Sequence, residues 1–215
     1  MPNLISRAVK RRLGKPALLI TFALASAVCV SAPNEPVNDR YCKTCHGSDG
    51  RGNEAIQAPI LAGMEYWYLI RQLKNYRGKV RGFHPSDERV IAMQAMANNL
   101  SDESIRDIVG WIKTCEYTPP DATVNGDKAE GKKLYASCAA CHREDASGNE
   151  AIGAPPLAYQ NDWYLVKQLE NFSNGYRGTH ESDIFGQQMV AMVKQLKDDT
   201  GIRNVVSYII SLRSD

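Results

Sequence analysis

The sequence predicts an all-α fold built from two tandem copies of one small domain. The main observation is an internal repeat: shifted by 96 residues, the chain overlays on itself without a gap for most of a domain. Several segments also place apolar residues at i, i+3, i+4 and i+7, which is the spacing of one helix face. No segment shows the alternation of apolar and polar residues that is typical of a half-buried strand.

The composition fits one or two globular domains and argues against several other classes of protein. The chain has 215 residues, and domains average about 150 residues. Its mean hydropathy of −0.38 argues against a polytopic membrane protein. The 26 Lys and Arg residues face 24 Asp and Glu residues, so we expect no nucleic-acid partner. Six cysteines are too few for a disulfide-dense scaffold of this length.

Residues 1–32 have the pattern of a secretory signal peptide. Five basic residues and no acidic ones precede an uncharged, mostly apolar run over residues 17–32. Ala25-Ser26-Ala27 fits a small-x-small cleavage site, whereas cleavage after Ala32 would leave the disfavoured Pro33 first. An uncleaved anchor is the alternative, although spanning needs about 20 apolar residues. Without this leader, 21 basic residues face 24 acidic ones, a formal net charge of −3.

The remaining chain divides into residues 33–117 and 127–215, joined by a linker over residues 118–126. Pro119-Pro120 in this linker prevents a helix from continuing through it. Within the two copies we expect helices, in chain order, over residues 67–76, 105–112, 127–140, 163–172 and 202–209. Ser101 can cap the helix that contains residues 105–112, because Asp102 and Glu103 then fall in its first turn. Long loops join these helices.

Each copy contains the pattern C-x-x-C-H, which is the attachment motif of c-type haem. The first motif supplies Cys42, Cys45 and His46, and the second supplies Cys138, Cys141 and His142. Two thiols about one helical turn apart can add to the two vinyl groups of one porphyrin, and the adjacent imidazole then reaches the iron. A zinc site with four cysteines would need the two pairs closer in sequence. A thioredoxin-like pair would need a βαβ context, which is absent.

The second axial ligand of each iron must lie further along each copy. Met93 and Met189 each follow the motif histidine by 47 residues, and a thioether ligand favours ferrous iron. Met96 and Met192 lie one helical turn later, and spacing alone does not choose between the two methionines of a pair. The two remaining histidines compete as ligands, but their flanking residues predict surface turns and contacts to a propionate or a partner. These histidines are His84 and His180.

Beyond the motifs, the chain resembles the dihaem class I cytochromes c of the cytochrome c4 type. The resemblance covers about residues 38–212 and includes Pro59-Ile60-Leu61-Ala62-Gly63 and Tyr68-Leu69-Ile70-Arg71-Gln72-Leu73. It implies two class I domains, each wrapped around one covalently bound haem c. It implies Met93 and Met189 as axial ligands, because each stands seven residues before a characteristic leucine. It also implies that the carbonyls of Pro59 and Pro155 orient the proximal imidazoles.

Two features depart from this family pattern. The first copy has few residues before Cys42, so we expect its leading helix to be short. Cys115 has no counterpart in the second copy. We expect it to be a buried thiol, with an intermolecular disulfide as the alternative.

The sequence therefore predicts a periplasmic electron carrier and not an enzyme. Expected partners are donor and acceptor complexes in the membrane: a quinol-oxidising complex or dehydrogenase, and a terminal oxidase or reductase. Arg77, Lys79 and Arg81 form a candidate docking patch. An uncleaved leader would add membrane association. The alternatives are a dihaem enzyme, namely a peroxidase or a thiosulfate dehydrogenase, and a fixed haem subunit of a larger oxidoreductase.

Overall fold

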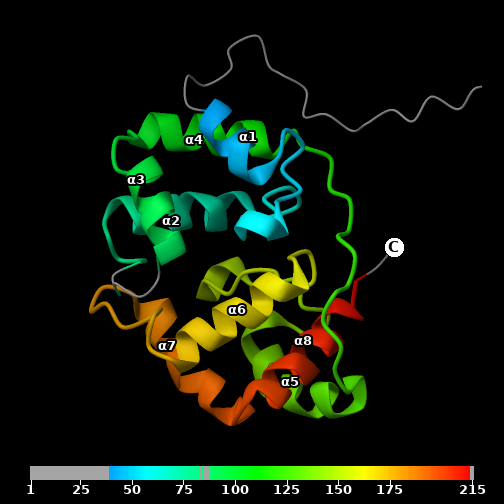
Figure 1. Cartoon of the computed structure of the whole chain (residues 1–215). Helices are drawn as coiled ribbons and strands as arrows, with labels where there is room; N and C mark the ends of the chain where they lie inside the picture. Colours follow the sequence, from blue (N-terminus) through cyan, green and yellow to red (C-terminus); the bar gives the residue numbers. More distant parts are fainter. Residues whose placement is uncertain (1–38, 83, 85–87, 214–215) are drawn as a thin grey trace, which may run out of the picture.

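The computed structural model describes residues 39–82, 84 and 88–213, whose helices form two units stacked one above the other (Figure 1). The first unit contains α1 (Asp39–His46), η1 (Glu54–Ile56), α2 (Tyr66–Arg77), α3 (Glu88–Ala97) and α4 (Asp102–Ile112). The second contains α5 (Lys128–His142), η2 (Glu150–Ile152), α6 (Asp162–Ser173), α7 (Ile184–Val193), η3 (Lys194–Leu196) and α8 (Asp199–Ile210). No strand occurs in this described part of the chain, which confirms the all-α fold.

The expected leader, with both candidate cleavage sites, lies outside the described residues. Among the helices that are described, none is long and apolar enough to cross a lipid bilayer.

The two units repeat each other in local structure as well as in sequence. The side chain of Asn53 accepts a hydrogen bond from the backbone N–H of Ala55 at the start of η1. Asn149 does the same for Ala151 at the start of η2. A β-bridge follows at the same place in each unit, between Asn53 and Ala58 and between Asn149 and Ala154. The internal repeat therefore folds twice into the same turn.

The helices expected from apolar periodicity are all present. The Ser101 side chain accepts a hydrogen bond from the backbone N–H of Ser104, so the predicted cap of α4 is confirmed. The helix expected over residues 127–140 continues to His142, and Asp127 is its N-cap. The second motif thus occupies the last turn of a helix of 15 residues. Within the described residues its counterpart α1 spans eight.

Two helices lie where the sequence analysis expected loops. These are α3 and α7, which carry Met93 and Met189. Apolar residues occur on several sides of α7, whose sequence is IFGQQMVAMV, so it lacks the single apolar stripe that identifies a surface helix. This pattern suits a helix that packs between a core and a ligand cavity.

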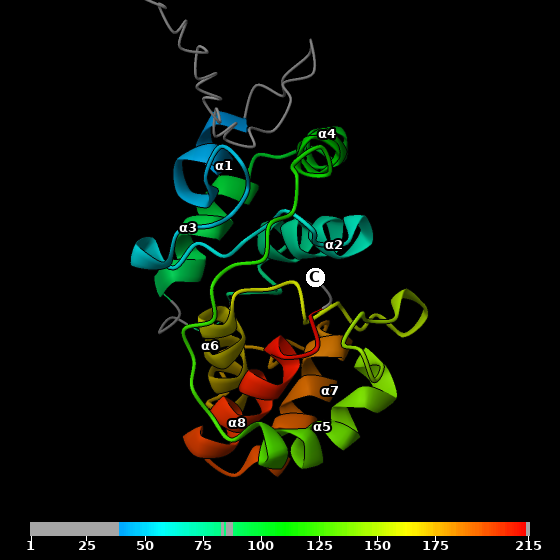
Figure 2. The same cartoon turned by 90° about the vertical axis from the view of Figure 1, so that its right-hand side faces the viewer.

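Each unit has its own hydrophobic core, and an extended segment connects the two. The segment between α4 and α5 runs along the side of the molecule from the upper unit to the lower one (Figure 2). The buried carboxylate of Asp162 accepts hydrogen bonds from the backbone N–H groups of Thr123 and Val124. Arg213 donates a hydrogen bond to the carbonyl of Pro120. The end of the connection is thereby attached to the second unit.

Candidate functional site

The first motif places its histidine in the interior of the first unit. His46 is 6% exposed, and its Nδ1 lies 2.7 Å from the carbonyl oxygen of Pro59. Because a carbonyl can only accept, Nδ1 carries the proton, and the lone pair of Nε2 is left for a metal. Burial lowers the pKa of His46, although the hydrogen bond to Pro59 acts in the opposite direction. The imidazole is therefore kept neutral, as metal ligation requires.

The second motif repeats this geometry and opens onto a cavity. His142 is 5% exposed, and its Nδ1 lies 2.8 Å from the carbonyl oxygen of Pro155. Burial again lowers the pKa of the imidazole. Cys138, Cys141 and His142 line the cavity together with Met189. The cavity is open to solvent on one side.

The cysteines of both motifs remain available for thioether bonds. None of the four is disulfide-bonded. The second pair lies at i and i+3 in α5, which places both sulfur atoms on one side of the helix. In the described part of the chain, no group of three or more His, Cys, Asp or Glu side chains is arranged to hold a metal ion. A zinc site formed from the two cysteine pairs is therefore not assembled.

The methionines of each pair have different surroundings. Met93 is half-buried against the core of the first unit, whereas the Met96 side chain is 43% exposed. In the second unit Met189 and Met192 both line the cavity. Met189 packs against the core, and the sulfur of Met192 lies 3.6 Å from Nε2 of Gln195. These contacts separate two methionines that sequence spacing leaves equivalent.

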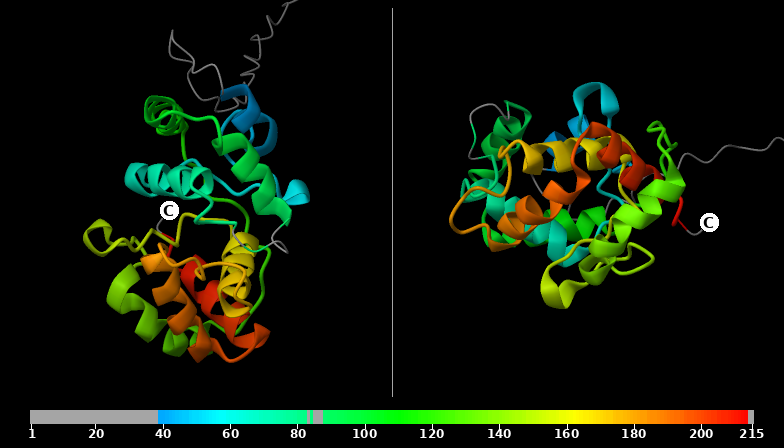
Figure 3. Two further views of the ribbon diagram at one scale, coloured as in Figure 1. Left: turned by 90° about the vertical axis from the view of Figure 1, so that its left-hand side faces the viewer. Right: turned by 90° about the horizontal axis from the view of Figure 1, so that it is seen from below.

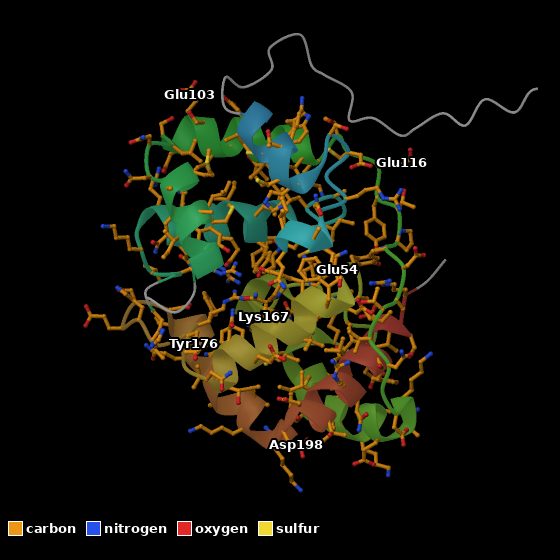
Figure 4. All side chains as sticks on the ribbon, viewed as in Figure 1. Glu54, Glu103, Glu116, Lys167, Tyr176 and Asp198 are labelled. Atoms are coloured by element: carbon orange, nitrogen blue, oxygen red, sulfur yellow. The ribbon has the colours of Figure 1, made fainter. Side chains whose placement is uncertain are left out.

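The two further histidines lie in bends outside the helices. The ring of His84 packs on Tyr176 of the other unit, with 4.7 Å between ring centroids. Figure 4 shows Tyr176 close to the boundary between the units. Nδ1 of His180 accepts a hydrogen bond from the backbone N–H of Ser182, and His180 is not among the residues that line the cavity.

Cys115 corrects one expectation. It is buried in the core of the first unit, as predicted. It is disulfide-bonded, however, so the expected thiol is wrong. Its partner is none of the four motif cysteines.

Two arginines lie where the units meet: Arg81, which the sequence placed in a docking patch, and Arg177, which the sequence assigned to no site. Nη1 of Arg81 donates to Oε1 of Gln72 at 2.7 Å, and Nη1 of Arg177 donates to Oε1 of Gln168 at 2.7 Å. Each arginine also reaches the other unit. Nη2 of Arg81 donates to Gln168 at 2.9 Å, and Nη2 of Arg177 donates to Gln72 at 3.3 Å. The repeat itself contains the signal for this arrangement, because all four residues recur at the 96-residue shift.

This arrangement excludes Arg81 from the expected docking patch. Arg81 is only 5% exposed, because it is covered by the second unit. Arg77 donates hydrogen bonds to Asp102 and to the carbonyl of Leu100 within the first unit. The prediction that Arg77, Lys79 and Arg81 together form an exposed docking patch is therefore wrong.

The guanidinium groups of Arg81, which is buried, and Arg177, which is partly buried, are positioned to bind anions. Among the described residues, neither Arg81 nor Arg177 forms an ion pair with a carboxylate, and the Nε atoms of both are buried without a hydrogen-bond partner. Burial alone would raise the pKa of Tyr68, but the charges of Arg177 and Arg81 outweigh it and lower that pKa. Buried charges are costly unless they are paired. The propionates of a haem in each unit fit this requirement, as the thiols and imidazoles fit its vinyl groups and iron.

Comparisons with known proteins agree with this geometry. The family model of cytochrome c matches residues 36–116 and again residues 128–213. Cytochrome c4 of Stutzerimonas stutzeri is 32% identical over 208 residues, which cover 91% of this chain and 97% of that protein. The thiosulfate dehydrogenase electron acceptor of Stutzerimonas stutzeri strain A1501 is 29% identical, over 80% of this chain and 78% of that protein.

Solved structures lead to the same family. The structure of cytochrome c4 from Acidithiobacillus ferrooxidans superposes with a TM-score of 0.64 at 25% identity. The match covers 80% of this chain and 99% of that one. The chain belongs to the cytochrome c family and is a cytochrome c4-like electron-transfer protein that carries two covalently bound haem c groups.

Proposed function

We propose that this protein is a periplasmic carrier of single electrons between respiratory complexes. Its donor is a quinol-oxidising complex or a dehydrogenase, and its acceptor is a terminal oxidase or a reductase. The observation that carries this proposal is the equivalence of the two sites: each has a buried histidine bound to a proline carbonyl and a partly buried methionine. A histidine and a methionine on each iron leave no position for a substrate, which suits electron transfer without bond chemistry.

In this proposal the chain holds each haem through four groups. Cys42 and Cys45 attach the first haem, with His46 and Met93 as its axial ligands. Cys138 and Cys141 attach the second, with His142 and Met189. The carbonyls of Pro59 and Pro155 keep each imidazole in the tautomer that leaves Nε2 for the iron.

The haem supplies the one-electron couple, and the protein residues set its surroundings. Arg81 and Arg177 neutralise the propionates at the boundary between the domains. The motif histidines stay neutral because they are buried. We place the domains at residues 33–117 and 127–215, with the linker over residues 118–126.

Replacing the axial methionines tests the ligand set. Met93→Ala and Met189→Ala are each expected to remove about half of the red absorption band of methionine-ligated ferric haem, because each variant loses one of two iron–sulfur bonds. The band is measured on the purified, oxidised protein that contains both haems.

Met96→Ala and Met192→Ala are the matched controls, because they remove a sulfur one helical turn away. We expect both to keep the full band. A band that survives in Met93→Ala and is lost in Met96→Ala would assign the ligand of the first haem to Met96, and the same comparison applies to the second pair.

Export is tested by the mass of the purified protein. We expect the signal segment within residues 1–32 to be removed, so the intact mass should equal the chain without its leader plus two haems; cleavage after Ala27 would leave residues 28–215. A mass that includes residues 1–27 would instead favour a membrane-attached carrier.

One comparison favours a particular donor. A relative bears the name of an electron acceptor for thiosulfate dehydrogenase, so an enzyme that oxidises thiosulfate is a second candidate donor. Catalysis by this chain itself is the competing function. Turnover of thiosulfate or of peroxide by the purified protein alone would contradict the role of a simple carrier.

A further inference from the structure

Several residues of the first domain lie in the wall of the second haem cavity, and Arg71 is one of them. Arg71 belongs to α2, yet it lines the cavity that contains Cys138, His142 and Met189. Figure 3 shows α2 (teal) lying along the boundary, with the second domain directly below it. The cavity of the second haem is therefore completed by the first domain.

Arg71 is fixed at this position by two kinds of contact with the second domain. Its Nη2 donates a hydrogen bond of 2.6 Å to the carbonyl of Gly153. Its guanidinium carbon lies 4.4 Å from the ring centroid of Phe185, within the range of a cation–π interaction. Both Gly153 and Phe185 line the cavity. On its own side, the guanidinium lies over Trp67, 4.8 Å from the ring centroid.

Gly153 makes this close approach possible. A Cβ atom at this position would lie 2.6 Å from Nη1 of Arg71 and 2.7 Å from Cζ of Phe185. Gly153 also has a φ of 69°, in the left-handed region that favours glycine. The backbone of Gly153 therefore lies close to both the Arg71 guanidinium and the Phe185 ring. A larger residue at position 153 would push these two side chains away.

The sequence does not repeat this contact in the opposite direction. The positions equivalent to Arg71, Gly153 and Phe185 hold Lys167, Gln57 and Arg89. Lys167 pairs with Glu170 of its own helix at 3.8 Å, and Figure 4 labels it on α6. The first domain therefore has neither a glycine nor an aromatic residue at the positions equivalent to Gly153 and Phe185 in its sequence. The contact is thus one-sided in a molecule that is otherwise built from a repeat.

We propose that Arg71 is a positioning residue for the second haem, which closes its cavity from the first domain and raises the potential of that haem alone. A fixed positive charge near an iron favours the reduced state, which carries one positive charge fewer, and the effect is large where water is excluded. This inference rests on the proposed function, because it needs a haem in the cavity that Arg71 lines.

The test is a redox titration of the protein with both haems, as the wild type and as Arg71→Gln. We expect the midpoint of the second haem to fall and that of the first to stay in place. A tenfold fall in the equilibrium constant for reduction of the second haem would lower its midpoint potential by about 59 mV, because one electron is transferred. The step that changes in Met189→Ala identifies the second haem.

Two further variants separate charge from structure. Arg71→Lys keeps the charge and should restore most of the potential, although it loses the planar contact with Phe185. Lys167→Gln removes a cation from the equivalent position of the other domain and should leave both potentials unchanged. Equal shifts of both haems in Arg71→Gln, no shift of the second haem, or the same shift in Lys167→Gln would each overturn the inference.

These outcomes are distinct from a failure of the proposed function. If the wild-type protein turned over thiosulfate or peroxide by itself, the proposal of a carrier would fall while the titration of Arg71→Gln still reported on the cavity. If the wild type only transfers electrons and Arg71→Gln has the same two potentials as the wild type, the role of Arg71 is rejected and the proposed carrier function stands.

Discussion

The double substitution Cys138→Ala, Cys141→Ala is expected to give a protein with one covalent haem and one redox step in place of two. Both thioether bonds of the second domain are removed, and we expect the remaining ligation by His142 and Met189 not to hold a haem through purification. Intact mass under denaturing conditions counts the haems directly. A redox titration should then show the uptake of one electron per molecule where the wild type takes up two.

The same pair of changes is expected to disturb the first domain as well. The side chain of Asn161 accepts a hydrogen bond of 2.7 Å from the backbone N–H of Ile60, the residue after Pro59. Gln160 donates to the carbonyl of Ile60 at 3.3 Å. A second domain that loses its haem loosens these contacts beside the loop that holds His46. We therefore expect the potential of the remaining haem to shift.

The mirror variant Cys42→Ala, Cys45→Ala provides the control. It should also carry one haem, attached to the second domain. A mass of two haems in either variant would show that attachment does not depend on the replaced thiols. A remaining haem with an unchanged potential in both variants would mean that the two domains are redox-independent.

Most of the fold follows from the sequence because each copy contains local signals for its helices. The spacing of Ile105, Ile108, Val109 and Ile112 predicts α4, and the same residues are buried in the core. The helices α3 and α7 are missed by sequence reasoning, and α7 lacks the single apolar stripe that identifies a surface helix. Apolar residues repeated every 3.6 positions indicate a helix that packs on one hydrophobic core. They do not indicate a helix that also contacts a cofactor.

The part of the candidate site that the sequence predicts is the part carried by the two C-x-x-C-H motifs. The motifs identify the thiols and the histidines directly, and the hydrogen bonds from His46 to Pro59 and from His142 to Pro155 follow the expected geometry. The role of Arg81 was not predictable from its neighbours in sequence. Its closeness in sequence to Arg77 and Lys79 indicates a surface cation, whereas docking of the second domain buries it. Contacts between domains leave no local periodicity.

The substitution Gly131→Ala is expected to cause a large loss of stability in the second domain. Gly131 lies in α5 where this helix crosses α8. A Cβ atom there would collide with the carbonyl oxygen of Asn204 and would lie 2.9 Å from Cβ of Tyr208. The obstacle is backbone and cannot rotate away, so the helices must separate. Overpacking of this kind costs about 3 kcal/mol, which lowers the unfolding midpoint by about 4–8 °C per kcal/mol in a domain of this size.

Gly110→Ala is the matched control, because Gly110 is also a helical glycine but has open space around its Cα. No atom lies within 4 Å of the position that its Cβ would take. Alanine there should raise stability by about 0.5–1 kcal/mol through its higher helix propensity. Thermal unfolding of the haem-loaded variants, followed by circular dichroism, should therefore move in opposite directions. Equal midpoints for the two variants would show that α5 and α8 can separate at little cost, and that the close approach at Gly131 does not stabilise the second domain.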